Sequence, residues 1–168
     1  MSYKSGSKLV RDLYPDLEKD KFDYQESSEE DIGVYSLLKL GEEIFEFLQA
    51  QKTANESIGE MSDILQILED FLSSTILNEK SSMPIPEENK QLSLEDKLAQ
   101  QLGRYANTNN DQTKKHSIAS NIIDILKKYA KTNNISWDSV LEAKSKKSTK
   151  KGDFKNHIIS VPKESKKV

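Results

Sequence analysis

The sequence predicts an all-α fold: a helical bundle of two tandem antiparallel helical hairpins, followed by a C-terminal helix and tail. Two observations support this. Apolar residues recur at helical spacing in several successive segments. Charged residues make up 32% of the chain and hydrophobic residues only 35%, a balance that favours solvated helix faces over a thick-cored sheet. The length of 168 residues is sufficient to bury a real core in one domain.

The first hairpin is expected over residues 34–51 and 58–72, with a polar turn at 52–57. In each helix the apolar residues gather on one half of the helical wheel. They are Leu37, Leu38, Leu40, Ile44, Phe45, Phe47 and Leu48 in the first helix, and Met61, Ile64, Leu65, Ile67, Leu68, Phe71 and Leu72 in the second.

A linker and a second hairpin follow. Pro84 and Pro86 prevent a helix in the linker. Helical periodicity resumes over residues 94–106 and 117–132, joined by a loop at 107–115, and a last helix runs from 137 to about 147 with Ser136 as its N-cap. We therefore expect a single domain, 1–168, divided into the first hairpin (34–77), the linker (78–92), the second hairpin (93–132) and the C-terminal helix with its tail (133–168).

The two hairpins resemble each other. A shift of 58 positions lays Ile64, Ile67 and Leu68 on Ile122, Ile125 and Leu126 without a gap, which suggests an internal duplication. The acidic positions do not repeat. Glu42, Glu43, Glu46, Glu60 and Asp63 correspond to Gln100, Gln101, Arg104, Ile118 and Asn121. The second hairpin is thus expected to be a degenerate copy that binds no metal.

Five carboxylates of the first hairpin form the candidate site. Glu42, Glu43 and Glu46 occupy the polar sector of their helix, which alone is typical of a solvated face. Glu60 instead lies within the apolar arc of the next helix, with Asp63 at its edge, where an ionised carboxylate is costly unless it is paired or metal-bound. The chain has no Cys and only two His, so any metal must be held by oxygen.

A hard divalent cation is the natural partner of these carboxylates. Mg²⁺ keeps several waters and is commonly bound by a few carboxylates together with substrate phosphates. We therefore expect Mg²⁺, with Mn²⁺ as the alternative, and a phosphate-bearing substrate. A twelve-residue Ca²⁺ loop and the Glu-x-x-His pairs of di-iron bundles are both absent from the sequence.

The spacing of the carboxylates resembles that of a known family, the all-α nucleoside triphosphate pyrophosphohydrolases, which include MazG, the dimeric dUTPases and phosphoribosyl-ATP pyrophosphohydrolase. Its signature, Glu-Glu-x-x-Glu followed by Glu-x-x-Asp, stands here as residues 42–46 and 60–63, with thirteen residues between. The ends are similar to the MazG-like house-cleaning branch, through Lys8-Leu9-Val10-Arg11-Asp12, Ile135-Ser136, and Lys147 with Lys151-Gly152-Asp153-Phe154. The chain departs from the family in two ways. Lys151 and Asp153 replace the Arg and the second Gly of its Arg-Gly-Gly-Phe element. In addition, some 58 extra residues lie between the Glu-x-x-Asp helix and Ile135-Ser136, which follow each other almost directly in the family.

The resemblance implies hydrolysis of a nucleoside triphosphate between the α and β phosphates, giving a monophosphate and pyrophosphate. By position, Glu43, Glu46, Glu60 and Asp63 would bind the metal, and Glu42 and Glu43 would be catalytic. Lys8, Arg11 and Lys39 would contact phosphate, although Lys8 and Arg11 could instead pair with the acidic stretch 12–31, and Lys39 could be an ordinary surface residue. Members of the family build their sites in dimers or larger assemblies of such hairpins. The degenerate hairpin would then act as a partner within the same chain, so that a monomer resembles a dimer; a homodimer is the alternative.

Other functions are also compatible with these residues. The alternatives are a phosphoribosyl-ATP-type hydrolase, a non-catalytic nucleotide- or metal-binding helical protein, and a structural adaptor. The start of the chain lacks an apolar signal core and no segment is apolar enough to cross a membrane, so a cytoplasmic protein is expected. Residues 144–167 contain nine Lys, but they contain no Arg and only one Phe, Phe154, and we do not expect a nucleic-acid partner.

Overall fold

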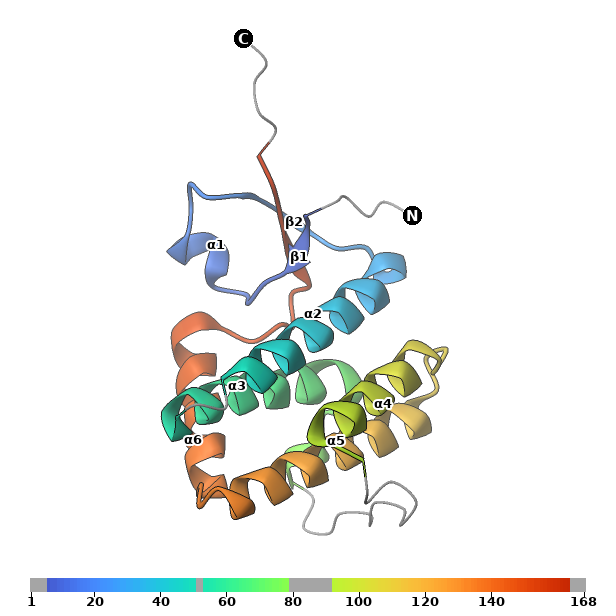
Figure 1. Cartoon of the computed structure of the whole chain (residues 1–168). Coiled ribbons are helices and arrows are strands. Elements are labelled where there is room, and N and C mark those ends of the chain that lie inside the picture. The colour runs from blue at the N-terminus through green and yellow to red at the C-terminus, as the bar shows by residue number, and fades with distance from the viewer. Residues whose placement is uncertain (1–5, 51–52, 79–91, 164–168) are drawn as a thin grey trace.

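The structure, a computed structural model, describes residues 6–50, 53–78 and 92–163. It is mainly helical, as predicted, with a small three-stranded sheet at one end of the molecule (Figure 1). The elements are β1 (Lys8–Leu9), α1 (Tyr14–Leu17), β2 (Asp23–Glu26), α2 (Glu29–Gln49), α3 (Ala54–Ile67), a π-helical turn η1 (Leu68–Leu72), a 3₁₀ turn η2 (Ile76–Asn78), α4 (Leu94–Ala106), α5 (Gln112–Thr132), α6 (Trp137–Lys151) and β3 (Ile158–Val161).

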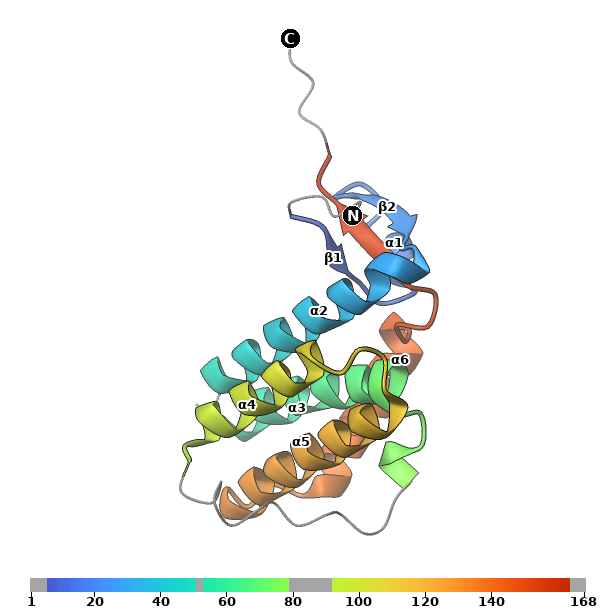
Figure 2. The same ribbon diagram turned by 90° about the vertical axis from the view of Figure 1, so that its right-hand side faces the viewer.

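The sheet corrects the expectation of a purely helical fold with a plain C-terminal tail. Its strand order is β1-β3-β2, and both outer strands run antiparallel to β3. Leu9 pairs with Ile159, and Gln25 pairs with Ile159 from the other side. Strand β3 therefore joins β1 and β2, and the three strands lie together with β1 against α2 (Figures 1 and 2).

Helices α2 and α3 begin earlier than their apolar periodicity indicates. The first starts at Glu29, where the hydroxyl of Ser28 accepts a hydrogen bond from the Asp31 N–H. The second starts at Ala54 after a similar cap by Thr53. Polar first turns with side-chain caps satisfy the free N–H groups of a helix start but carry no apolar signal. After Ile67 the helix widens into the π-turn η1.

The remaining helices follow the prediction more closely. Helix α4 has the predicted bounds, and α6 extends to Lys151 rather than to about residue 147. Helix α5 begins at Gln112, within the expected loop, because Asp111 caps it. Ser136 occupies the N-cap position of α6, but its side chain makes no capping hydrogen bond. The predicted linker lies almost wholly outside the described residues.

The core lies between the pairs α2–α3 and α4–α5, with α6 against α3 (Figure 2). Its fully buried side chains include Leu40, Phe47, Met61, Leu98 and Leu126. The ring of Phe47 meets the ring of Tyr129 on α5 edge-on at 4.9 Å between centroids, and the Ser36 hydroxyl hydrogen-bonds the Tyr105 hydroxyl on α4 at 2.8 Å. These contacts fix α2, which carries Glu42, Glu43 and Glu46, against the second pair of helices.

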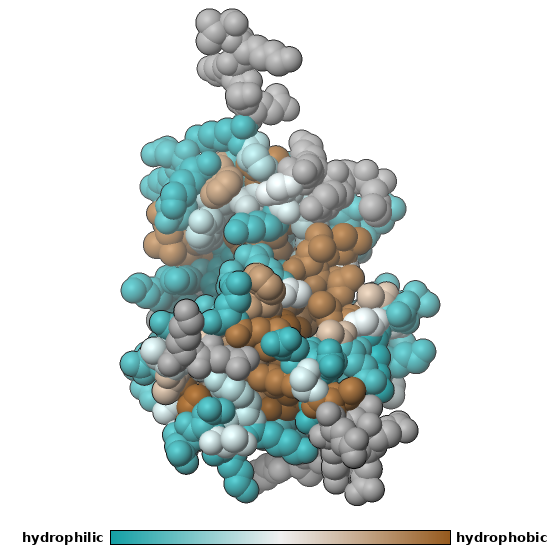
Figure 3. Space-filling model, in the orientation of Figure 1, coloured by the Kyte–Doolittle hydropathy of each residue, from teal (hydrophilic) through white to brown (hydrophobic). Residues whose placement is uncertain are grey.

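The surface is mostly hydrophilic, with apolar patches across the middle of the face shown in Figure 3. On α2, Leu38 and Phe45 are exposed although the helical pattern had placed them with the core. None of the described helices has both the length and the apolar character needed to span a membrane.

Candidate metal centre

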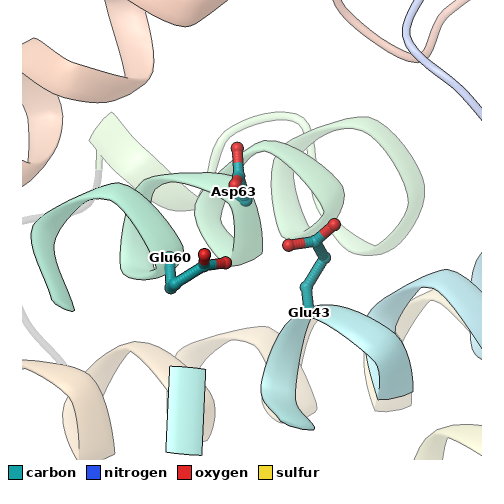
Figure 4. Close-up of side chains that lie close together, drawn as sticks. All are labelled: Glu43, Glu60 and Asp63. Atoms are coloured by element: carbon teal, nitrogen blue, oxygen red, sulfur yellow. The ribbon is translucent and has the colours of Figure 1, made fainter. Parts of the chain in front are cut away.

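Three carboxylates from α2 and α3 converge at the centre of the first helix pair. Glu43 reaches from α2 toward α3, and Glu60 and Asp63 project from successive turns of α3 (Figure 4). One oxygen from each lies within 4.8 Å of the others. The helical spacing of three residues places Glu60 and Asp63 on neighbouring positions of one helix face, so two short segments suffice to build the cluster.

The cluster is partly buried and incompletely satisfied. Glu43 is only 6% exposed. Its Oε2 atom and the Oε2 atom of Glu60 are buried without a hydrogen-bond partner among the described residues. Leaving a buried oxygen of a carboxyl group unpaired costs free energy. These two oxygens therefore point to a ligand that would complete their contacts.

Burial raises the pKa of Glu43 to about 7, although the nearby Lys39 ammonium group counteracts this, while Asp63 and Glu46 add repulsion. Burial also raises the pKa of Glu60, and repulsion from Asp63 raises it further. The pKa of Glu46 rises for the same reason, burial first and then repulsion from Glu60. Without a cation, this group of carboxyls thus holds protons more tightly than isolated glutamates do.

Two lysines flank the outer side of the cluster. Lys39 Nζ lies 3.3 Å from Glu43 Oε1 and 3.6 Å from Glu42 Oε2. Lys8 Nζ lies 3.6 Å from Glu42 Oε1. Glu42 therefore stands between two ammonium groups. Lys39 is not an ordinary surface residue, because its side chain is only 12% exposed and faces the carboxylates.

Two further cations meet at Asp63. Arg11 Nη2 donates to its Oδ1 atom at 2.7 Å, and Lys147 Nζ donates to its Oδ2 atom at 2.9 Å. Arg11 is almost fully buried, with Nη1 on the Gly152 carbonyl and the guanidinium over the Phe154 ring. Arg11 and Lys8 thus pair with the site rather than with the acidic stretch 12–31.

Hydrogen bonds between the segment around Arg11 and the segment after α6 hold Arg11 in place. Asp12 accepts hydrogen bonds from the N–H groups of Lys155 and Asn156, and the Phe154 N–H donates to Asp70 in η1, directly after α3. Together with the β1–β3 pairing, these bonds attach the segment after α6 to the segment that carries Arg11. The sheet that the sequence did not predict is therefore part of what positions the site.

The predicted site residues fall into three groups. Glu43, Glu60 and Asp63 form the cluster. Glu46 lies outside that trio but within electrostatic reach of Glu43 and Glu60. Glu42 and the three predicted phosphate contacts, Lys8, Arg11 and Lys39, surround it. Lys147, a further partner of Asp63, is not among the predicted site residues, although the resemblance places it in the C-terminal Lys element.

The second helix pair offers an internal comparison. Gln101 and Asn121, at the positions of Glu43 and Asp63, are buried, and the Asn121 side-chain amide donates to Gln101 Oε1 at 3.2 Å. Ile118, at the position of Glu60, is 3% exposed and belongs to the hydrophobic core. Where the equivalent positions are neutral, they satisfy one another and need no cation.

The donor set of the first pair fits a divalent metal. All its ligand atoms are carboxylate oxygens, which Mg²⁺ and Mn²⁺ prefer, and two of them are buried and unpartnered among the described residues.

The chain matches no protein-family model, no curated protein and no solved structure.

Proposed function

We propose that this chain is a Mg²⁺-dependent nucleoside triphosphate pyrophosphohydrolase of the all-α type, which cleaves between the α and β phosphates and acts in the house-cleaning of noncanonical nucleotides. One observation carries the proposal: a trio of carboxylates from two helices, with two buried unpartnered oxygens, stands among four cationic side chains. Mixed charge of this kind suits a metal together with a phosphate chain.

Glu43, Glu60 and Asp63 would hold the metal, with Glu46 completing the set. Mg²⁺, when bound, would neutralise charge on the phosphate oxygens and lower the pKa of the attacking water. The metal would also give the buried Oε2 atoms of Glu43 and Glu60 a partner, which would offset the free-energy cost of burying them unpaired. Burial and repulsion raise the pKa of both Glu43 and Glu60, so a metal would compete with protons for these carboxyls, because only the ionised carboxylate is a ligand.

The cations around the cluster would bind and orient the triphosphate. Lys8 and Lys39 stand on the α2 side, and Arg11 and Lys147 stand on the Asp63 side. Their charge would offset the charge that develops on the leaving pyrophosphate. Because Arg11 is held by Gly152 and Phe154, its guanidinium is preorganised for this role.

Glu42 would position the nucleophilic water and accept its proton. Its carboxylate lies beside the metal-binding group, and both of its oxygens face ammonium groups at 3.6 Å. In the overall reaction the water oxygen forms a bond to phosphorus, the bond to the bridging oxygen breaks, and pyrophosphate leaves with the electron pair. The proton of the water passes to the carboxylate and then to solvent.

The test is pyrophosphate release from a panel of ordinary and modified nucleoside triphosphates with Mg²⁺, repeated with Mn²⁺. Glu60→Gln and Asp63→Asn are each expected to lower kcat at least 100-fold. Glu56→Gln, which removes an exposed carboxylate one turn earlier on the same helix, is the matched control and should retain activity. Hydrolysis that survives both site substitutions would refute the assignment.

A binding protein without turnover is the second candidate, because Asp153 brings an acid into the C-terminal element. Its side chain bonds Ser148 and lies 3.6 Å from Lys155 Nζ. Calorimetry that detects nucleotide binding with Mg²⁺ while no pyrophosphate is formed would favour this candidate. A structural adaptor, in contrast, predicts that neither Mg²⁺ nor Mn²⁺ raises the melting temperature.

A further inference from the structure

A cavity of about 540 Å³ lies on the second helix pair, between the end of α4 and the beginning of α5. Arg104 and the amides of Gln100 and Asn107 line it from the α4 side. Lys114 and Ser117 line it from α5, and Ile118 contributes an apolar wall. It shares no lining residue with the carboxylate cluster of the first pair.

The cavity carries positive charge. Arg104 and Lys114 form no ion pair with any of the described residues, and none of the residues that line the cavity is acidic. Gln100 and Ser117 add further polar side chains to the lining, whereas the Asn107 side-chain amide donates to the Gly103 carbonyl. Two unpaired cations beside an amide and a hydroxyl are the donors that bind phosphate oxygens.

The cavity occupies the positions that match the carboxylate site under the shift of 58 residues. Gln100 stands for Glu42, Arg104 for Glu46, and Ile118 for Glu60. The change from Glu46 to Arg104 reverses the charge at that position. An ionised carboxylate repels phosphate unless a cation lies between them, whereas a guanidinium binds phosphate directly and can do so in a bidentate manner.

We propose that this cavity is a second anion site, which binds the phosphate groups of a nucleotide or of free pyrophosphate without a metal. The volume is sufficient for a ligand of that size. Arg104 and Lys114 contact the phosphates, and Ile118 supplies the apolar wall beside them. The proposal depends on the cavity and its charges and goes beyond the proposed hydrolysis at the first pair.

The test is isothermal titration of the full chain in EDTA, with inorganic pyrophosphate in one arm and ATP in the other. Binding is expected without metal, and the double variant Arg104→Gln with Lys114→Gln should weaken it at least tenfold. Lys131→Gln, which removes an exposed cation from the last turn of the same helix, should leave it unchanged. The single variant Arg104→Lys, in which Lys114 is intact, should bind more tightly than the double variant. Tighter binding of ATP than of pyrophosphate identifies a nucleotide site; equal binding identifies a pyrophosphate site.

Glu60→Gln separates this proposal from the proposed hydrolysis, because it should abolish turnover and leave the metal-free binding intact. Absence of metal-free binding in both arms, or binding that the double variant does not weaken, would overturn the second site and leave the first untouched. A melting curve for each variant checks that the substitutions have not unfolded the chain.

Discussion

At the scale of single residues, the protonation of Glu43 is the most informative property of the free protein. Its pKa in the folded state, about 7, exceeds the ordinary value of 4.5. The folded state therefore binds this proton more tightly than the unfolded state does. The resulting stabilisation is complete below about pH 4.5 and is lost as the pH rises through 7.

We therefore expect the metal-free protein to lose roughly 1–3 kcal/mol of unfolding free energy between pH 5 and pH 8 from this residue. Urea denaturation in EDTA across that range measures it. Glu43→Gln should reduce the slope, and Glu56→Gln should not. Mg²⁺ should stabilise the protein more at pH 8 than at pH 5, because at low pH protons compete for the carboxylate. A stability that is independent of pH in the wild-type protein would contradict this account.

The sequence identified the carboxylates because Glu60 broke an apolar arc, which is a local signal. It could not show that Glu43 would be more buried than Glu46, because both lie on the polar sector of α2, and the depth of each depends on how α3 crosses it. The partner of Arg11 was equally out of reach. Arg11 and Asp63 are 52 positions apart, and no pattern of one segment reveals a pairing between two.

At the scale of elements, helix existence followed from periodicity, whereas helix starts and strands did not. The first turns of α2 and α5 are polar and depend on the caps Ser28 and Asp111. The strands are two to four residues long, too short for alternation to stand out. Moreover, β3 pairs with β1 across most of the chain, so its partner could not be inferred locally.

The backbone conformation directly after α6 is expected to require glycine at position 152. Its φ of +85° suits glycine, and a Cβ there would lie 2.9 Å from the Leu13 nitrogen. Gly152→Ala should destabilise the protein by roughly 1–3 kcal/mol. Under the proposed hydrolysis it should also raise KM for the nucleotide, because the Gly152 carbonyl holds Arg11.

Urea denaturation and KM together measure both effects of the Gly152 substitution. Gly33→Ala is the matched control, because a Cβ there meets nothing within 4 Å in the exposed interior of α2. It should stabilise the protein by about 0.5–1 kcal/mol. If Gly152→Ala were as stable as the wild type, the close approach of the two chain ends would have no energetic importance.

At the scale of the whole molecule, the question is whether the second helix pair substitutes for a partner subunit. The repeat in the sequence suggested it, but two amphipathic hairpins can look alike because both must bury one face. The pairing of Gln101 with Asn121 adds a specific correspondence: the positions that meet in the first pair also meet in the second. An apolar pattern alone would not produce that.

Deletion of residues 78–132 tests this directly. The deletion removes Tyr129 from the Phe47 ring and Tyr105 from Ser36, which exposes the face of α2 and α3 that α4 and α5 cover. We expect the full chain to be a monomer of 19.1 kDa and the shortened chain to form a dimer through that face, as measured by light scattering after size exclusion. Phe47→Lys in the shortened chain should abolish the dimer, because a buried charge at its centre would be unpaired. A shortened chain that remains folded and monomeric would show that the second pair of helices replaces no subunit, since the face it covers would then tolerate water.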